Sequence, residues 1–151
     1  MEAKLINPGP PRIWAVVLES GEEAVACLTR FAREQNLEAS QLTAIGAFSR
    51  AVLGFFDFAR RGYRRIAVDE QVELVSLLGD IALENGVPKL HAHVAVGRSD
   101  GTTRGGHLLE AIVQPTLEAI VAESPSWLRR EHDAETGLAL IRTGSRTKMR
   151  A

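Results

Sequence analysis

The spacing of apolar residues changes along the chain from a helical period to a strand period. After position 23, apolar side chains recur every three or four residues, which is typical of the buried face of an amphipathic helix. This face consists of Ala24, Val25, Leu28, Phe31 and Ala32. The pattern predicts a helix that runs to about Gln35. Ser20 and Glu23 fit a capping box at its start, in which each side chain accepts a backbone N–H.

The remaining apolar runs are typical of strands. A short β-rich run at 13–18 precedes the helix, and longer runs follow it between turn signals. The later runs span residues 42–58, 72–82, 89–96, 107–113, 117–122 and 138–141. One helix followed by a series of strands favours a single α+β domain with a largely antiparallel sheet, against which the N-terminal helix packs. We expect an irregular segment at 1–12, the domain at 13–141 and a flexible basic tail at 142–151.

Length and composition agree with one small domain. The 151 residues are 45% apolar, which is enough for a buried core. The 18 basic residues nearly balance the 19 acidic ones, whereas a nucleic-acid-binding domain usually carries a basic excess or a basic face. Cys27 is the single cysteine, so no intrachain disulfide framework can form. Because the sequence shows neither a secretory signal nor an apolar run of about 20 residues, we expect a cytoplasmic protein that does not enter a membrane.

Three histidines form the most informative pattern. In a strand over 90–96, successive side chains alternate between two faces, so the apolar positions would face the core and His91 and His93 would lie together on the other face. If this strand pairs with the segment that carries two glycines before His107, that histidine faces the other two across the ladder. Three neutral imidazoles are good ligands for zinc and similar divalent ions and leave one position open. The sequence therefore predicts a divalent metal site, with zinc as the expected ion.

The histidine segments also resemble a known family, the PPC (plants and prokaryotes conserved) domain, which is also called DUF296. The resemblance covers nearly all of 13–141 and implies an α+β fold with an antiparallel sheet. It also implies a compact homotrimer and a metal held by His91, His93 and His107. It rests on four segments: 72–80 (VELVSLLGD), 89–93 (KLHAH), Asp100-Gly101 and 105–108 (GGHL).

The resemblance implies less about activity than about fold. Plant relatives carry an AT-hook, an Arg-Gly-Arg-Pro element that enters the minor groove, and bacterial relatives have often been labelled DNA-binding proteins. The nearest segment in this chain, Arg61-Gly62-Tyr63-Arg64, lacks that pattern. In the plant proteins the PPC domain resembles an oligomerisation and partner-binding module. The resemblance therefore implies a metal-binding homo-oligomer with a regulatory or scaffolding role, associated with protein partners or with DNA.

Other residues give weaker signals. Glu73 lies in an apolar strand and is a candidate general base or fourth ligand if it faces the metal, and a structural residue if it does not. Arg98 and Arg104 flank the loop before the third histidine and are candidates for binding an anion, although loop arginines are usually solvated. His132 lies among charged residues and is expected in a solvated loop. A candidate cluster for direct DNA binding consists of Arg60, Arg61, Arg64 and Arg65.

Three functions stay open from the sequence alone. The leading hypothesis is the metal-binding homo-oligomeric module. The second is a small metal-dependent enzyme with an open three-histidine site, and the third is a DNA-binding protein that uses the arginine cluster and the basic tail. A deep pocket at the metal with a carboxylate in reach would favour the enzyme. A sealed metal site would favour the module, and a continuous basic face would favour the DNA-binding protein.

Overall fold

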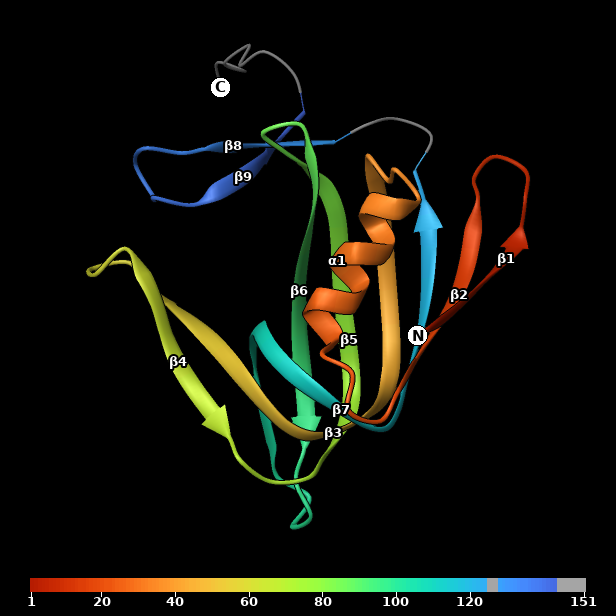
Figure 1. Ribbon diagram of the computed structural model, residues 1–151. Coiled ribbons are helices and arrows are strands. Elements are labelled where there is room, and N and C mark those ends of the chain that lie inside the picture. The colour runs from red at the N-terminus through yellow and green to blue at the C-terminus, as the bar shows by residue number, and fades with distance from the viewer. Residues whose placement is uncertain (125–127, 144–151) are drawn as a thin grey trace.

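The computed structural model describes residues 1–124 and 128–143, and these residues form nine strands and one helix (Figure 1). Most of the tail expected at 142–151 lies outside the described residues. In chain order the elements are β1 (Glu2–Asn7), β2 (Ile13–Glu19), α1 (Ala24–Glu34), β3 (Ala39–Asp57), β4 (Gly62–Val68), β5 (Val72–Glu84), β6 (Val87–Gly97), β7 (Thr103–Glu123), β8 (Arg129–His132) and β9 (Ala139–Arg142). The prediction of one domain with a mostly antiparallel sheet and one helix is confirmed.

The long strands pair in a ring. β3 pairs with β5, β5 with β6, and β6 with the first part of β7, while β7 returns to pair with β3. All of these pairs are antiparallel, and β2 continues the sheet beyond the second part of β7. β3 and β7 each pair with different partners along their length. Register shifts interrupt the ladder between them, and such irregularities let the strands bend. The result is a strongly curved sheet with one face turned toward α1.

The helix begins at Glu23, whose side chain accepts hydrogen bonds from the backbone N–H groups of Val25 and Ala26. The same carboxylate also accepts the N–H of Ala111 in β7, at 3.0 Å, which ties the start of α1 to the sheet. The capping box expected at Ser20 is wrong, because the Ser20 hydroxyl instead donates to the carbonyl of Pro115. At Ser20 the chain is still hydrogen-bonded to β7, so the helix is capped three residues later, by Glu23.

The core lies between α1 and the inner face of the sheet. Phe31 of the helix meets Trp14 of β2 edge to face, with ring centroids 5.8 Å apart. In β6 the predicted alternation is confirmed, since the four apolar residues expected to face the core are buried: Leu90, Ala92, Val94 and Val96. His91 and His93 consequently lie on the outer face of the sheet.

Two strands differ from the sequence prediction. Glu2–Asn7 forms β1 and pairs with β2, so the irregular segment expected at 1–12 is wrong for these residues. Arg129–His132 forms β8, which pairs with β9 and runs parallel to the end of β5, so His132 lies in a strand and not in a loop. β8 is polar and lacks the apolar alternation by which a strand is detected. β1 is a short edge strand, and the prolines that follow it favoured an irregular segment.

Among the described residues, no helix is both long and apolar enough to cross a membrane.

Candidate metal centre

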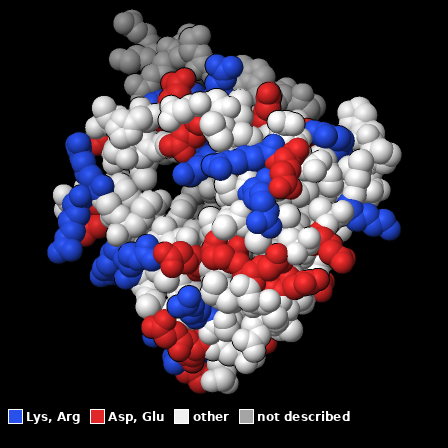
Figure 2. Space-filling view, in the orientation of Figure 1, with Lys and Arg blue, Asp and Glu red and all other residues white. Residues whose placement is uncertain are grey.

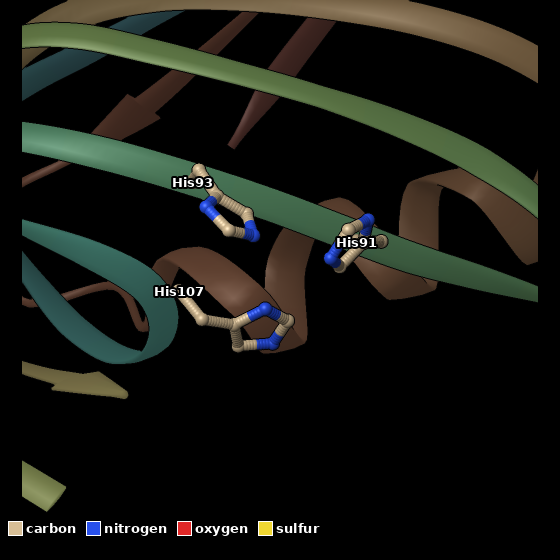
Figure 3. Close-up of side chains that lie close together, drawn as sticks. All are labelled: His91, His93 and His107. Carbon is tan, nitrogen blue, oxygen red and sulfur yellow. The ribbon is translucent and has the colours of Figure 1, made fainter. Parts of the chain in front are cut away.

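Three imidazoles converge on the outer face of β6 and β7. His93 and His107 are direct partners in the antiparallel pairing of these strands, and His91 lies two residues before His93 on the same face. One potential ligand atom from each ring lies within 4.8 Å of the others, and the ring centroids are 5.0 to 5.4 Å apart. Figure 3 shows the three rings facing one another from the two strands. The structure therefore brings together the three residues that the sequence singled out.

The surroundings keep two of these rings neutral. Burial, followed by the charges of His91 and His93, lowers the pKa of His107 to about 4. Partial desolvation within the cluster, followed by the charge of His91, lowers the pKa of His93. A neutral imidazole has a free lone pair for a metal. Moreover, Nδ1 of His107 is buried and finds no hydrogen-bond partner among the described residues. A polar nitrogen in this situation costs free energy unless something binds it, so the three-nitrogen set fits a divalent ion.

Close backbone packing positions the histidines. A Cβ atom built on Gly106 would lie 2.8 Å from the carbonyl oxygen of Gly54 in β3, so only glycine lets these strands approach beside His107. A Cβ atom on Gly79 would lie 2.7 Å from the carbonyl oxygen of His91. Gly106, directly before His107, therefore permits the close approach of β7 to β3 at the site.

Two further residues, Asp80 and Arg130, support His91 and were not among the predicted site residues. Asp80 lies opposite His91 in the β5–β6 ladder, and its Oδ2 is 3.4 Å from Nδ1 of that ring. Nη2 of Arg130, in β8, donates to both oxygens of Asp80 at 2.7 and 2.8 Å and lies 3.1 Å from the same Nδ1. Although burial opposes it, these hydrogen bonds from His91 and Arg130 lower the pKa of Asp80.

This arrangement can orient a metal ligand. Histidine ligands usually donate their second ring N–H to a carboxylate, which fixes the tautomer and the ring. When Nε2 of His91 is left free for a metal, Nδ1 carries the proton and Asp80 is the acceptor within reach. Arg130 holds that carboxylate, and its own side chain is only 8% exposed. Asp80 ends the 72–80 segment of the resemblance, but Arg130 lies in a charged stretch that gave no signal.

Glu73 is not brought to the site. It is exposed near the start of β5, where it pairs with Ala47 and Gly97. The residue of β5 that lies opposite His93 is Leu78, five positions further, or about 16 Å along the strand. The geometry does not support Glu73 as a general base or a fourth ligand.

Arg98 and Arg104 also lie away from the histidines, at the turn end of the β6–β7 hairpin. Arg98 donates to Glu70 at 2.7 Å and to Asp100 at 3.5 Å, while Arg104 donates to the carbonyl of Ala67. Arg98 thus has acidic partners and Arg104 a backbone partner, and neither residue is brought to the three histidines.

The four arginines considered for DNA binding do not form one surface. Arg64 and Arg65 are successive residues of β4 and therefore point to opposite faces. Arg64 lies over the ring of Phe55 and Arg65 pairs with Glu110. Arg60 lies 3.9 Å from Asp57, and Arg61 lines a cavity beside the histidines.

This cavity has a volume of about 780 Å³ and lies between two hairpins. The β3–β4 hairpin forms one wall and the β8–β9 hairpin the other, and all three histidines line the space between them. Figure 2 shows the surface hollowed between the arms that Figure 1 labels β4 and β8–β9, with Lys and Arg side chains beside the hollow. The histidine site is therefore open to a ligand from solvent.

A curved antiparallel sheet with one helix and an outward-facing three-histidine cluster defines a small domain with a candidate metal site. Its family follows from sequence comparison. The chain belongs to the plants and prokaryotes conserved domain family, abbreviated PCC or PPC, whose model matches residues 6–125. The match includes β6 and the histidine-bearing part of β7, and it ends before β8.

Several solved structures are similar. A plant- and prokaryote-conserved protein from Pyrococcus horikoshii is 30% identical, with a TM-score of 0.82 over 87% of this chain and 91% of that chain. A candidate DNA-binding protein from Bacteroides thetaiotaomicron is 28% identical, with a TM-score of 0.86 over 93% and 96% of the two chains. A metal-containing protein from Archaeoglobus fulgidus is 30% identical, with a TM-score of 0.81 over the same shares.

Two curated relatives are much longer. Both are called bifunctional protein GlmU and come from two Synechococcus strains, and each is 31% identical to this chain, over 139 and 132 residues. The chain spans about a fifth of the length of these relatives.

Proposed function

We propose that this protein is a metal-binding domain that holds one divalent ion, zinc in the first instance, with His91, His93 and His107. The observation that carries the proposal is the convergence of three imidazoles on one sheet face, with potential ligand atoms within 4.8 Å of one another. Three histidine nitrogens suit zinc better than they suit magnesium or calcium, which prefer oxygen. The similarity to the metal-containing protein from Archaeoglobus fulgidus supports the proposal.

The chain supplies three things to such an ion. His91, His93 and His107 provide nitrogen ligands, and the depressed pKa values of His93 and His107 keep those two rings unprotonated at neutral pH. Asp80, held by Arg130, can accept the Nδ1–H of His91 and so orient that ring. The cavity leaves one side of the cluster open. An ion bound there would supply a Lewis-acidic centre with an open position.

Zinc titration of the metal-depleted protein tests the proposal. Competition against a chromophoric chelator should reveal one equivalent of zinc per chain, with a dissociation constant below about 1 µM, because three imidazoles are already gathered. Two results would contradict the proposal: zinc uptake well below one equivalent per chain, or an affinity as weak as a single histidine would give.

We further propose that the chain assembles as a homotrimer, as the family resemblance implies. An exposed apolar area on the outer face of the sheet supports this proposal. Leu78 and Ile120 both lie opposite Thr43 in the ladders of β3 and are 61% and 45% exposed, and Ile45 lies on the same face. Contiguous exposed apolar side chains on a small protein mark contact surfaces.

Light scattering should therefore give about three times the subunit mass of 16.4 kDa. The double variant Ile45→Glu, Ile120→Glu should shift the protein to the monomer mass, because charged side chains are costly in a buried interface. Phe58→Glu is the matched control: Phe58 is also exposed but lies in the β3–β4 turn. A wild-type monomer at micromolar concentration would contradict the trimer.

The similarity to a candidate DNA-binding protein fits a role associated with DNA, but the surface does not favour strong direct binding. Basic and acidic side chains are interleaved on the face in Figure 2. Fluorescence anisotropy with duplex DNA at physiological salt should show no complex tighter than about 1 µM, the edge of the non-specific range. A nanomolar, salt-sensitive complex that is lost on substitution of the arginine cluster would show that assembly creates a basic surface and would overturn this expectation. That cluster consists of Arg60, Arg61, Arg64 and Arg65.

A further inference from the structure

The cavity beside the histidines carries more positive than negative charge. Its charged lining residues are Arg61, Lys89, Arg130 and a single acid, Glu84. The partners of Arg130 include Asp80, so that charge is compensated. Lys89 lies 3.9 Å from Glu84, a loose and exposed contact. Arg61 makes no hydrogen bond or ion pair with any described residue. A divalent ion on the histidines would add further positive charge, so the cavity suits an anion.

The cationic side chains are directed toward the site. Lys89 precedes His91 and His93 at two-residue intervals on β6, so all three share one strand face and line the cavity together. Arg61 reaches the cavity from the opposite wall. Its side-chain carbons lie 3.6 to 4.0 Å from the position of a Cβ atom built on Gly137, in the β8–β9 turn. Its stem therefore packs across the gap between the two hairpins.

The rest of the cavity is largely apolar. Tyr63 packs against His107, with ring centroids 4.7 Å apart, and its hydroxyl has no hydrogen-bond partner within the described part of the chain. Leu138 and Leu140 line the wall formed by the β8–β9 hairpin, and the exposed ring of Phe55 lines the opposite wall. An inorganic anion would leave these apolar surfaces in water, whereas an anion with an apolar body would cover them.

We infer that this cavity binds a small organic carboxylate beside the histidine-held ion, with Lys89 and Arg61 attracting the carboxylate and Leu138 and Leu140 packing on its apolar body. The inference rests on the proposed metal site and adds the chemical class of its ligand. The cavity volume is in the range of pockets that hold small molecules. Both leucines belong to the β8–β9 hairpin, beyond the segment that matches the family.

Cobalt-loaded protein provides the test, because the visible spectrum of cobalt responds to a new neighbour. Benzoate, the probe, should change the spectrum saturably, and calorimetry should give the same affinity. Benzamide has the same shape without the charge, and acetate has the charge without the ring; both should bind at least about tenfold more weakly, since a charge-assisted contact and a buried ring are each worth about 1.4 kcal/mol or more.

The double variant Arg61→Gln, Lys89→Gln should keep one cobalt per chain and weaken benzoate about tenfold. Arg104→Gln, which removes a cation outside the cavity, should leave benzoate affinity unchanged. Cobalt uptake without any benzoate response would overturn the inference and leave the metal site standing. Equal affinity for benzoate and inorganic phosphate, or equal affinity of the double variant and the wild type, would also overturn it. Failure to take up cobalt or zinc would overturn the proposed function and this inference together.

Discussion

Replacing His93 with Ala is expected to abolish stoichiometric metal binding. His93 lies in the middle of the cluster, directly opposite His107 and two residues from His91 on the same strand face. Its loss leaves two nitrogens, and the affinity for zinc should fall by at least about a hundredfold, since each ligand contributes several kcal/mol to a site whose binding free energy is about 10–16 kcal/mol in small zinc domains. Elemental analysis after dialysis should find less than about 0.1 zinc per chain.

His132→Ala is the matched control for this variant. His132 is exposed on β8 and is not a member of the cluster, so its removal should leave one zinc per chain. Circular dichroism of both variants should match the wild type, because His93 is itself exposed and its side chain takes no part in the core. A His93→Ala protein with full metal content would contradict the assignment of the ligands.

Asp80→Asn is expected to weaken zinc binding by 10- to 100-fold without changing the ligand set. Loss of a carboxylate that orients a histidine ligand typically has an effect of this size, and Asp80 is the carboxylate within reach of Nδ1 of His91. The variant should also unfold more easily, by about 2 kcal/mol, because Arg130 is mostly buried and loses the anion that balances its charge. Zinc competition titration and urea denaturation measure the two effects.

Glu110→Gln is a suitable control for Asp80→Asn, because Glu110 also pairs with an arginine of another strand but lies in an exposed pair. Exposed ion pairs contribute little to stability, so neither zinc affinity nor the free energy of unfolding should change measurably. An Asp80→Asn protein that binds zinc as tightly as the wild type would show that Asp80 serves the fold alone.

The three-histidine cluster could be predicted because the sequence information that specifies it is local. Alternation over 90–96 assigns Leu90 and Ala92 to one face and His91 to the other, and the short turn after this strand brings β7 beside it. The helix α1 could be predicted for the same reason, because its apolar residues keep a helical spacing without interruption. Register within a hairpin of known length follows from the turn, so the approach of His107 to His93 needed no knowledge of distant strands.

The supporting residues could not be predicted in this way. Arg130 reaches Asp80 across 50 residues of sequence, through the parallel contact between β8 and the end of β5. A charged strand such as β8 has no apolar alternation. β1 is missing from the prediction because it is short and a proline-rich stretch follows it directly. The sequence predicts a capping box with Ser20 as the cap residue, and the cap by Glu23 was missed. Glu23 is held in place by the N–H of Ala111, a β7 residue far away in the sequence.

The cavity likewise depends on long-range packing. Tyr63 comes from β4, Lys89 from β6 and Leu140 from β9, and no spacing in the sequence relates them. The curved sheet places the two hairpins on either side of the histidines and leaves the space between them open. This opening distinguishes the site from a sealed structural metal centre and makes it suited to hold a ligand as well as an ion.

A crystal structure of the zinc-loaded protein, with anomalous diffraction recorded on both sides of the zinc absorption edge, tests the metal assignment most directly. We expect one anomalous peak per chain, from a zinc ion bonded to nitrogen atoms of His91, His93 and His107 at about 2.0–2.1 Å. Nδ1 of His91 should be hydrogen-bonded to Asp80. A zinc peak bound elsewhere on the chain, or a zinc-soaked crystal with no peak between these three rings, would contradict it.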